Sequence, residues 1–376
     1  MSKIKIMSIF GTRPEAIKMA PVVKELEKHE GIESIVCVTA QHREMLDQVL
    51  DLFQIKPDYD LNIMKAGQTL SEITSRVLLG LEEVIKEVRP HMVLVHGDTT
   101  TTFAGALAAF YQQVKVGHVE AGLRSGNIYS PYPEEANRML TGRLTHLHFA
   151  PTQGNKKNLL AEGIKEENIV LTGNTVIDAL LQVIKEDYRF ENELLNQLDY
   201  KNKKIILMTA HRRENLGEPM MNIFSAIREV ADQNEEIEIV FPIHLNPQVR
   251  NLAAEILGNT KNIHIIEPLD YEPFANLQGR SYMLLTDSGG IQEEAPALGK
   301  PVLVLRTETE RPEAVEAGTV KIAGVEKNRI VALMEELIHD KVAYDQMANA
   351  VNPYGDGKAA QRTVAAILEY FKDENC

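Results

Sequence analysis

The sequence has no tryptophan and little cysteine, with only Cys37 and Cys376 among its 376 residues. Neither belongs to a CxxC pair, so we expect no disulfide framework and no thiolate metal site. Positive charge is also scarce. The chain has 40 Lys and Arg residues against 54 Asp and Glu residues, which gives a net charge of −14. This charge argues against nucleic-acid and membrane partners, while a local site for a phosphorylated small molecule stays compatible with it.

Long hydrophobic runs are missing as well, since no apolar stretch approaches the roughly 18 residues of a membrane span. The opening MSKIKIMSIF is interrupted by Lys5 and lacks a small-residue cleavage site, which favours a first strand over a signal peptide. We therefore expect a cytoplasmic protein. Its length, with 44% hydrophobic and 25% charged residues, suits two ordinary globular domains.

Short apolar runs alternate with longer stretches of helical periodicity along the chain. The runs are rich in Ile and Val and lack polar alternation, which is typical of buried parallel strands. They lie at 4–10, 34–39, 92–96, 114–119, 146–150, 169–173, 204–210, 237–243, 262–268, 282–287, 301–305 and 319–323. Strands separated by helices predict βαβ units, and hence an α/β fold with two doubly wound, Rossmann-like domains.

Two further stretches bear on helices and on the domain junction. Thr69 and Glu72 form a capping box that predicts a helix start, and Pro90 favours an end to that helix just before it. The strand–helix rhythm weakens at 174–203. We expect this stretch to be mostly one long helix and to contain the junction.

Ligands of doubly wound sheets bind beyond the carboxyl ends of the strands, so polar residues there are candidates for a site. The first strand ends in FGTRPEAIKMAP, where Arg13 and Lys18 flank a helix start that favours an anion. Two later strands end at Asp98 and Glu120, carboxylates that could divide acid and base roles. The simpler interpretations are surface cations at a helix start and, for Asp98, a helix cap.

A second pair of acids, Glu134 and Glu135, opens a helix after the loop AGLRSGNIYSPYP. For Glu135 we favour a role as partner of the helix dipole, whereas Glu134 is a candidate for the site. A metal cage is the weaker alternative, because no HExxH motif or cysteine set accompanies the histidines. In such a metal cage, His118 would share a strand face with Glu120, and His146 would share one with His148.

The second half carries a pattern for phosphate. The motif TAHRRENLG places His211 and two arginines at a strand end, and a neighbouring strand ends at His244. More specific is LTDSGGIQEE, where 288–290 begin a helix whose backbone N–H groups suit a phosphate. With Glu294, Arg306 and Arg311 in the same region, the pattern indicates a nucleotide diphosphate site.

Taken together, these motifs resemble the non-hydrolysing UDP-N-acetylglucosamine 2-epimerases from end to end. They are GTRPEAIKMAP, VHGDTTTTFAG, GHVEAGLRS, SPYPEEANR, TAHRRENLGEPM, LTDSGGIQEEAP, KPVLVLR, TERPE, EAGT and NPYGDG. The resemblance implies a glycosyltransferase-B type fold with a cleft between two Rossmann-like domains. It places 1–173 and a returning C-terminal helix, 355–376, in the first domain and 174–354 in the second. It also implies a homodimer without a metal or redox cofactor.

The implied reaction is reversible epimerisation at C2 between UDP-N-acetylglucosamine and UDP-N-acetylmannosamine, feeding cell-surface polysaccharide synthesis. No carbonyl adjacent to C2 acidifies its hydrogen. The family therefore eliminates UDP to a 2-acetamidoglucal and adds UDP back, which requires carboxylates near both sugar faces and stabilisation of the leaving diphosphate.

The resemblance also implies roles for individual residues. The acid–base candidates are Asp98, Glu120 and Glu134, with His211 and Lys18 also implicated. Residues matching the substrate and UDP site are Arg13, Lys18, Leu269, Phe274, Ser288, Gly289, Gly290, Glu294 and Arg311. Residues matching a second, activating substrate site are Gln41, Glu134, Arg212 and His244. Glu44 and Gly67 depart from the Gln and Arg of many members, and a lost Arg contact costs roughly 1.5–3 kcal/mol.

Three other functions fit parts of the pattern. A hydrolysing epimerase would release N-acetylmannosamine and UDP. A retaining glycosyltransferase would share the fold but leave C2 unchanged. A nucleotide-sugar sensor would bind without turnover, but it would not need Asp98, Glu120, Glu134 and His211 on the sugar side.

Overall fold

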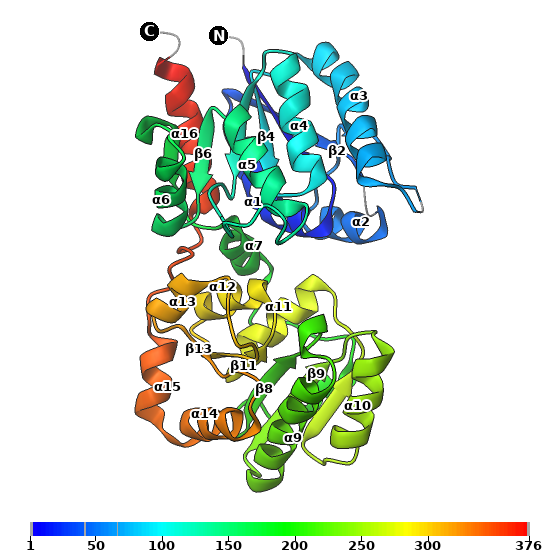
Figure 1. The fold of residues 1–376 in the computed structure, drawn as a ribbon, viewed down its shortest axis with the longest axis vertical. Coiled ribbons are helices and arrows are strands. Elements are labelled where there is room, and N and C mark those ends of the chain that lie inside the picture. Colours follow the sequence, from blue (N-terminus) through cyan, green and yellow to red (C-terminus); the bar gives the residue numbers. More distant parts are fainter. Residues whose placement is uncertain (1–2, 41–42, 66, 374–376) are drawn as a thin grey trace. The chain divides into compact units, whose positions relative to one another are not determined.

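The computed structural model describes residues 3–40, 43–65 and 67–373. Gln41, a candidate for the activating site, lies outside these residues. The chain divides into two compact α/β units, Met1–Leu181 with Tyr354–Cys376, and Gln182–Pro353. Figure 1 shows the elements of both units.

Within the described residues, the first unit has a seven-stranded parallel sheet in the order β3-β2-β1-β4-β5-β6-β7. Its strands are β1 (Ile4–Phe10), β2 (Ile32–Val38), β3 (Tyr59–Asp60), β4 (Met92–His96), β5 (Lys115–Val119), β6 (Leu147–Ala150) and β7 (Ile169–Leu171). Its helices are α1 (Arg13–Glu27), α2 (Arg43–Leu52), α3 (Leu70–Val88), α4 (Thr100–Tyr111), α5 (Glu134–Leu144), α6 (Gln153–Ala161), the short η1 (Glu166–Asn168), most of α7 (Thr175–Val183) and α16 (Ala359–Asp373).

The second unit, in the same part of the chain, has a six-stranded parallel sheet in the order β10-β9-β8-β11-β12-β13. Its strands are β8 (Lys204–Thr209), β9 (Ile237–Pro242), β10 (Ile263–Ile266), β11 (Met283–Thr286), β12 (Val302–Val304) and β13 (Val320–Ile322). Its helices are α8 (Glu193–Gln197), η2 (Arg213–Asn215), α9 (Glu218–Gln233), α10 (Pro247–Leu257), α11 (Tyr271–Arg280), α12 (Gly289–Ala297), α13 (Pro312–Glu316), α14 (Lys327–His339) and α15 (Lys341–Ala348).

Both sheets follow the doubly wound plan, in which the strand order reverses at one point. The reversal lies between β1 and β4 in the first unit and between β8 and β11 in the second. Ligands of such sheets bind at this point, beyond the carboxyl ends of the strands. The predicted fold class is therefore confirmed, and the strand ends that carry the candidate residues lie on both sides of each reversal.

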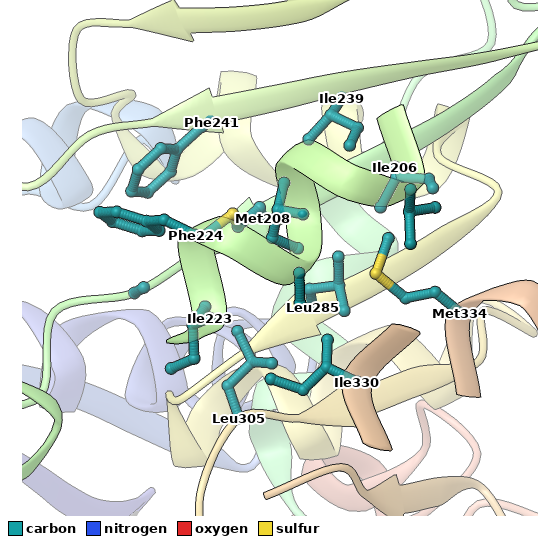
Figure 2. Close-up of a cluster of buried hydrophobic side chains, with 14 of the residues drawn as sticks. Ile206, Met208, Ile223, Phe224, Ile239, Phe241, Leu285, Leu305, Ile330 and Met334 are labelled. Atoms are coloured by element: carbon teal, nitrogen blue, oxygen red, sulfur yellow. The ribbon is translucent and has the colours of Figure 1, made fainter. Parts of the chain in front are cut away.

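The buried core explains why the apolar runs became strands. In the second unit, Phe224 on α9 packs edge-on against Phe241 on β9, and both are fully buried. Figure 2 shows these rings with the aliphatic side chains of β8, β9, β11 and α14 around α9. Burial of each large side chain contributes about 1.5–3 kcal/mol relative to exposure. Every strand predicted from the sequence is present, with ends shifted by up to two residues.

Two local features differ from the sequence predictions. The two-residue edge strand β3 was not predicted, because so short a segment carries no pattern. The prediction of mostly one long helix over 174–203 is wrong, since α7 ends at Val183 and α8 is short. The chain leaves the helix after Val183, and Phe190 further along is buried. The Phe190 backbone N–H and C=O form hydrogen bonds with the Asn196 side chain. The Phe190 ring lies under the Arg280 guanidinium.

The C-terminal helix α16 belongs to the first unit, where it packs against α1 (Figure 1). Asp178 on α7 is buried and accepts hydrogen bonds from the backbone N–H groups of Ala359 and Ala360. Backbone N–H groups in the first turn of a helix have no partner within the helix itself. By accepting from them, Asp178 anchors the start of α16. Across the described residues, no helix is both long and apolar enough to span a bilayer.

Candidate functional site

Glu120 follows β5 directly and is bound by side chains from two other parts of the first unit. Lys18, on α1, donates a hydrogen bond to Glu120 Oε2, and Asn174 Nδ2 donates to the same oxygen at 2.8 Å. Glu120 has a φ of 63°, a left-handed conformation that is uncommon for a residue with a side chain. Such conformations persist where the surroundings enforce them, and they cluster at functional sites. Glu120 is also outside β5, so the predicted strand face shared with His118 does not exist.

Asp98 lies beyond the neighbouring strand β4 and is held by α5. Its Oδ2 is 2.5 Å from Arg138 Nη2, and its backbone carbonyl accepts a hydrogen bond from Asn137 Nδ2 at 2.9 Å. The alternative interpretation of Asp98 as a helix cap is wrong. Thr99 is the N-cap of α4, where its hydroxyl accepts a hydrogen bond from the Thr102 N–H. The Asp98 carboxylate is thus not used by the helix.

Glu134 and Glu135 open α5, as predicted, but they differ in what surrounds them. Glu135 is 1% exposed and accepts hydrogen bonds from the backbone N–H groups of Ser125 and Gly126. It therefore holds the loop before α5, in addition to lying in the first turn of the helix. One oxygen of Glu134, Oε2, is buried and has no hydrogen-bond partner among the residues described. A buried carboxylate oxygen without a partner is unusual, and it distinguishes Glu134 from Glu135.

Sequence reasoning did not single out Glu15, which joins two of these loops. Its Oε2 accepts hydrogen bonds from the N–H groups of Gly11 and Thr12, and its Oε1 accepts one from the Thr99 hydroxyl at 2.6 Å. Burial raises the pKa of Glu15, while these hydrogen bonds oppose the shift. The side chain ties the turn after β1 to the loop that carries Asp98. A capping-box pattern, Thr12 with Glu15, was the available signal.

A row of buried histidines lies behind the carboxylates. His96 Nε2 is 3.8 Å from Glu120 Oε2, and His118 Nε2 bonds the Gly97 carbonyl at 2.7 Å. Burial lowers the pKa of His96 and of His118 to about 4, and that of His148 to about 3. These rings are therefore neutral at pH 7. In the part of the chain that is described, no group of three or more His, Cys, Asp or Glu side chains could hold a metal ion.

In the second unit, Ser288 is the N-cap of α12, and Gly289 and Gly290 form its first turn. The Ser288 hydroxyl makes no capping bond to the helix. A Cβ atom at Gly289 would lie 3.8 Å from the Arg311 guanidinium, which forms an ion pair with the buried Glu293. Backbone N–H groups, a hydroxyl and a guanidinium thus meet at one helix start, which is suited to a phosphate.

The remaining candidates of the second unit lie around this helix start or at neighbouring strand ends. Glu294, on α12, is 9% exposed and accepts a hydrogen bond from Gln278 Nε2 at 2.9 Å. The ring of His244, after β9, stacks on that of His211 with centroids 5.6 Å apart. Leu269 and Phe274 are half-buried in the segment from β10 into α11.

The fold and these strand-end residues define a two-domain Rossmann-like protein of the glycosyltransferase-B type. Residues 24–368 match the family model for UDP-N-acetylglucosamine 2-epimerase. The chain belongs to this family and is an epimerase.

Three relatives illustrate the match. The UDP-N-acetylglucosamine 2-epimerase of Bacillus subtilis is 57% identical over 99% of this chain and 97% of its own. A Listeria monocytogenes crystal structure has a TM-score of 0.94 at 56% identity, covering 99% of this chain and 98% of its own. The structure of the Neisseria meningitidis UDP-GlcNAc 2-epimerase bound to UDP-GlcNAc has a TM-score of 0.85 at 53% identity. The match covers 97% of this chain and 100% of that chain.

Proposed function

We propose that the protein interconverts UDP-N-acetylglucosamine and UDP-N-acetylmannosamine without releasing a free sugar. The observation that carries this proposal is the set of carboxylates at neighbouring strand ends of the first unit, with Glu120 bound by Lys18 and Asn174. Inverting a carbon requires removing a proton on one face and returning it on the other. Asp98, Glu120 and Glu134 are the groups that would do this, and we assign them jointly.

The chemistry is an elimination followed by an addition. A carboxylate takes the C2 proton while the bond from C1 to the diphosphate oxygen breaks, and UDP leaves with the electron pair. The C1–C2 double bond of a 2-acetamidoglucal results. Re-addition of UDP at C1 and protonation of C2 from the opposite face give the epimer. Lys18 would place the Glu120 carboxylate for one of these proton transfers.

The second unit would bind the nucleotide part. The N–H groups at the start of α12 and the Ser288 hydroxyl suit the diphosphate, and Glu294 suits the ribose hydroxyls. Arg311 would stabilise the charge that develops as UDP leaves. In the first unit, Arg13 and Lys18 are the cations that we assign to the diphosphate. Phe274 and the backbone at Leu269 would flank the uracil. The UDP-GlcNAc in the Neisseria meningitidis relative supports this class of ligand.

The proposal is tested by proton NMR of the full chain with UDP-N-acetylglucosamine in heavy water, with a chelator and no added metal. Loss of the C2 proton signal and formation of UDP-N-acetylmannosamine, without free sugar, are expected. Free N-acetylmannosamine with UDP would identify a hydrolysing enzyme instead. Binding of UDP-N-acetylglucosamine without any turnover would indicate a nucleotide-sugar sensor or a glycosyltransferase instead.

We further propose substrate activation at a second site involving Glu134, Arg212 and His244. Glu44 lies in the first turn of α2, and Gly67 has a left-handed φ of 70°. These are the two positions that depart from the pattern of many members. A lag when UDP-N-acetylmannosamine is the sole substrate is expected, and linear progress from the first seconds would contradict activation.

We also propose a cytoplasmic homodimer whose product feeds cell-surface polysaccharide synthesis. Large apolar side chains on α3 and α4 support a subunit contact, because Leu79, Phe110 and Tyr111 are 63%, 51% and 60% exposed. Sedimentation equilibrium of the purified chain tests the dimer, and a monomer at micromolar concentration would contradict it.

A further inference from the structure

Asp287 follows β11 and is completely buried. β11 pairs in parallel with β8, Thr286 opposite Thr209, so the residues that follow the two strands lie together. The backbone N–H groups of His211 and Arg212 each donate to Asp287 Oδ2 at 2.8 Å. A buried carboxylate needs such donors in place of water, and here they fix its orientation.

The other carboxylate oxygen faces the imidazole of His211. Asp287 Oδ1 lies 3.2 Å from His211 Nδ1, within ion-pair distance, and has no hydrogen-bond partner in the described part of the chain. A proton on Nδ1 would place a donor next to this buried acceptor. The His211 side chain is 37% exposed, so the ring remains accessible to a ligand. With Nδ1 occupied by Asp287, Nε2 is the ring nitrogen left for that ligand.

We propose that Asp287 is a positioning residue for His211, fixing the proton on Nδ1 and presenting Nε2 to the diphosphate of the substrate. Asp287 also stabilises the ring when Nε2 takes a proton from solvent beside the diphosphate, so that both nitrogens then donate. This inference rests on the proposed function and on the family resemblance, which implicates His211 alongside the acid–base candidates. Asp287 lies within the motif LTDSGGIQEEAP, but the sequence analysis assigned it no role.

The charged and titratable groups beside the ring are Asp287, His244 and Arg212. Burial lowers the pKa of His211, Asp287 opposes this shift, and His244 and Arg212 add to it. The ring is therefore mostly neutral at pH 7 before a ligand binds. A diphosphate brings negative charge to Nε2 and favours the protonated ring, which Asp287 then holds in place.

The first test measures the tautomer in the full-length protein labelled with ¹⁵N-histidine. Two-bond proton–nitrogen correlations distinguish Nδ1–H from Nε2–H, and the spectrum of His211→Gln identifies the His211 signals. Neutral His211 is expected to carry its proton on Nδ1. A proton on Nε2 in the wild-type protein would overturn the proposal, and this outcome does not depend on whether the protein turns over any substrate.

The second test uses Asp287→Asn, whose amide oxygen can still accept from the backbone while its NH₂ group faces Nδ1. The neutral ring should switch to Nε2–H, and kcat should fall by about 10²–10⁴-fold with a smaller change in KM. In the His211→Gln background, Asp287→Asn should lower kcat little further, because the ring it positions is gone. An undiminished loss in that background would show a purely structural role and overturn the proposal.

Asn215→Ala is the matched control. Asn215 Nδ2 donates to Asp287 Oδ2 at 3.2 Å and to the Leu305 carbonyl at 3.0 Å, without touching the ring. The variant should lower thermal stability and leave the His211 tautomer unchanged. A tautomer switch as large as that of Asp287→Asn would mean that the loop, and not the carboxylate, orients the ring. Failure of epimerisation with an Nδ1–H tautomer would count against the proposed function alone.

Discussion

Lys18 and Glu120 are 102 residues apart in the chain, yet the Lys18 ammonium donates a hydrogen bond to Glu120 Oε2. The side chains are 18% and 14% exposed, so water screens the pair only partly. The contact exists because β1, which leads into α1, pairs with β4, and β4 pairs with β5. The sheet order thus brings a cation from one strand end to a carboxylate at another.

Replacing Lys18 with Met should lower kcat by about 10²-fold or more, the usual effect of removing one preorganised donor from an active site. Lys24→Met is the control, because Lys24 is on the same helix but binds Glu27 and the Gln54 carbonyl at the surface. Steady-state kinetics of both variants make the comparison. If Lys18→Met were as active as the wild type, Lys18 would have no role in the reaction.

Arg138→Leu should lower both stability and activity. Arg138 is the ion-pair partner of Asp98 and of Glu135, and its side chain is only 11% exposed. Leaving a buried carboxylate without its cation costs about 3–5 kcal/mol, and Asp98 would lose its orientation. Thermal unfolding and kcat measure the two effects. Arg143→Leu, on the same helix with one bond to the Glu162 carbonyl, should change neither strongly.

Stability should fall between about pH 6.5 and pH 4 because of the buried histidines. The pKa values of His96 and His118 are lowered to about 4 and that of His148 to about 3, below the usual 6.5. The unfolded chain therefore binds more protons in this window. Each ring contributes stability above pH 6.5 that is lost as the pH falls through its lowered pKa, at most about 3 kcal/mol for His96 and His118 and about 5 kcal/mol for His148.

His148→Leu isolates one of these contributions. Neither ring nitrogen of His148 has a hydrogen-bond partner within the described residues, so an apolar side chain fits its surroundings. Unfolding midpoints in urea at pH 8 and pH 5 should differ less for the variant than for the wild type. An unchanged difference would show that His148 is not buried in its neutral form.

Gly11→Ala should destabilise the turn after β1. A Cβ atom at Gly11 would lie 1.9 Å from the Thr39 hydroxyl oxygen, so the turn or Thr39, which follows β2, would have to move. Such overpacking costs about 1–3 kcal/mol. Gly31→Ala is the control, since a Cβ atom there would meet no described atom within 4 Å. Similar melting temperatures for both variants would show that the turn accommodates the added methyl group at little cost in stability.

The sequence by itself determined most of the elements and the edge of each sheet that carries chemistry. Runs rich in Ile and Val became strands because they could be buried on both faces, and Thr69 with Glu72 opens α3 as predicted. In a parallel sheet the carboxyl ends lie together, so Asp98 and Glu120, or His211 and Asp287, follow adjacent strands. Local chemistry is sufficient for these conclusions.

Only the tertiary structure decided which charges meet. Lys18 reaches Glu120, Arg138 reaches Asp98, and Asp287 reaches His211 across gaps in sequence that no periodicity measures. The tertiary structure also ends α7 at Val183, ahead of the buried Phe190. Such pairings depend on strand order and on competition for buried space, which are properties of the whole fold and not of any segment.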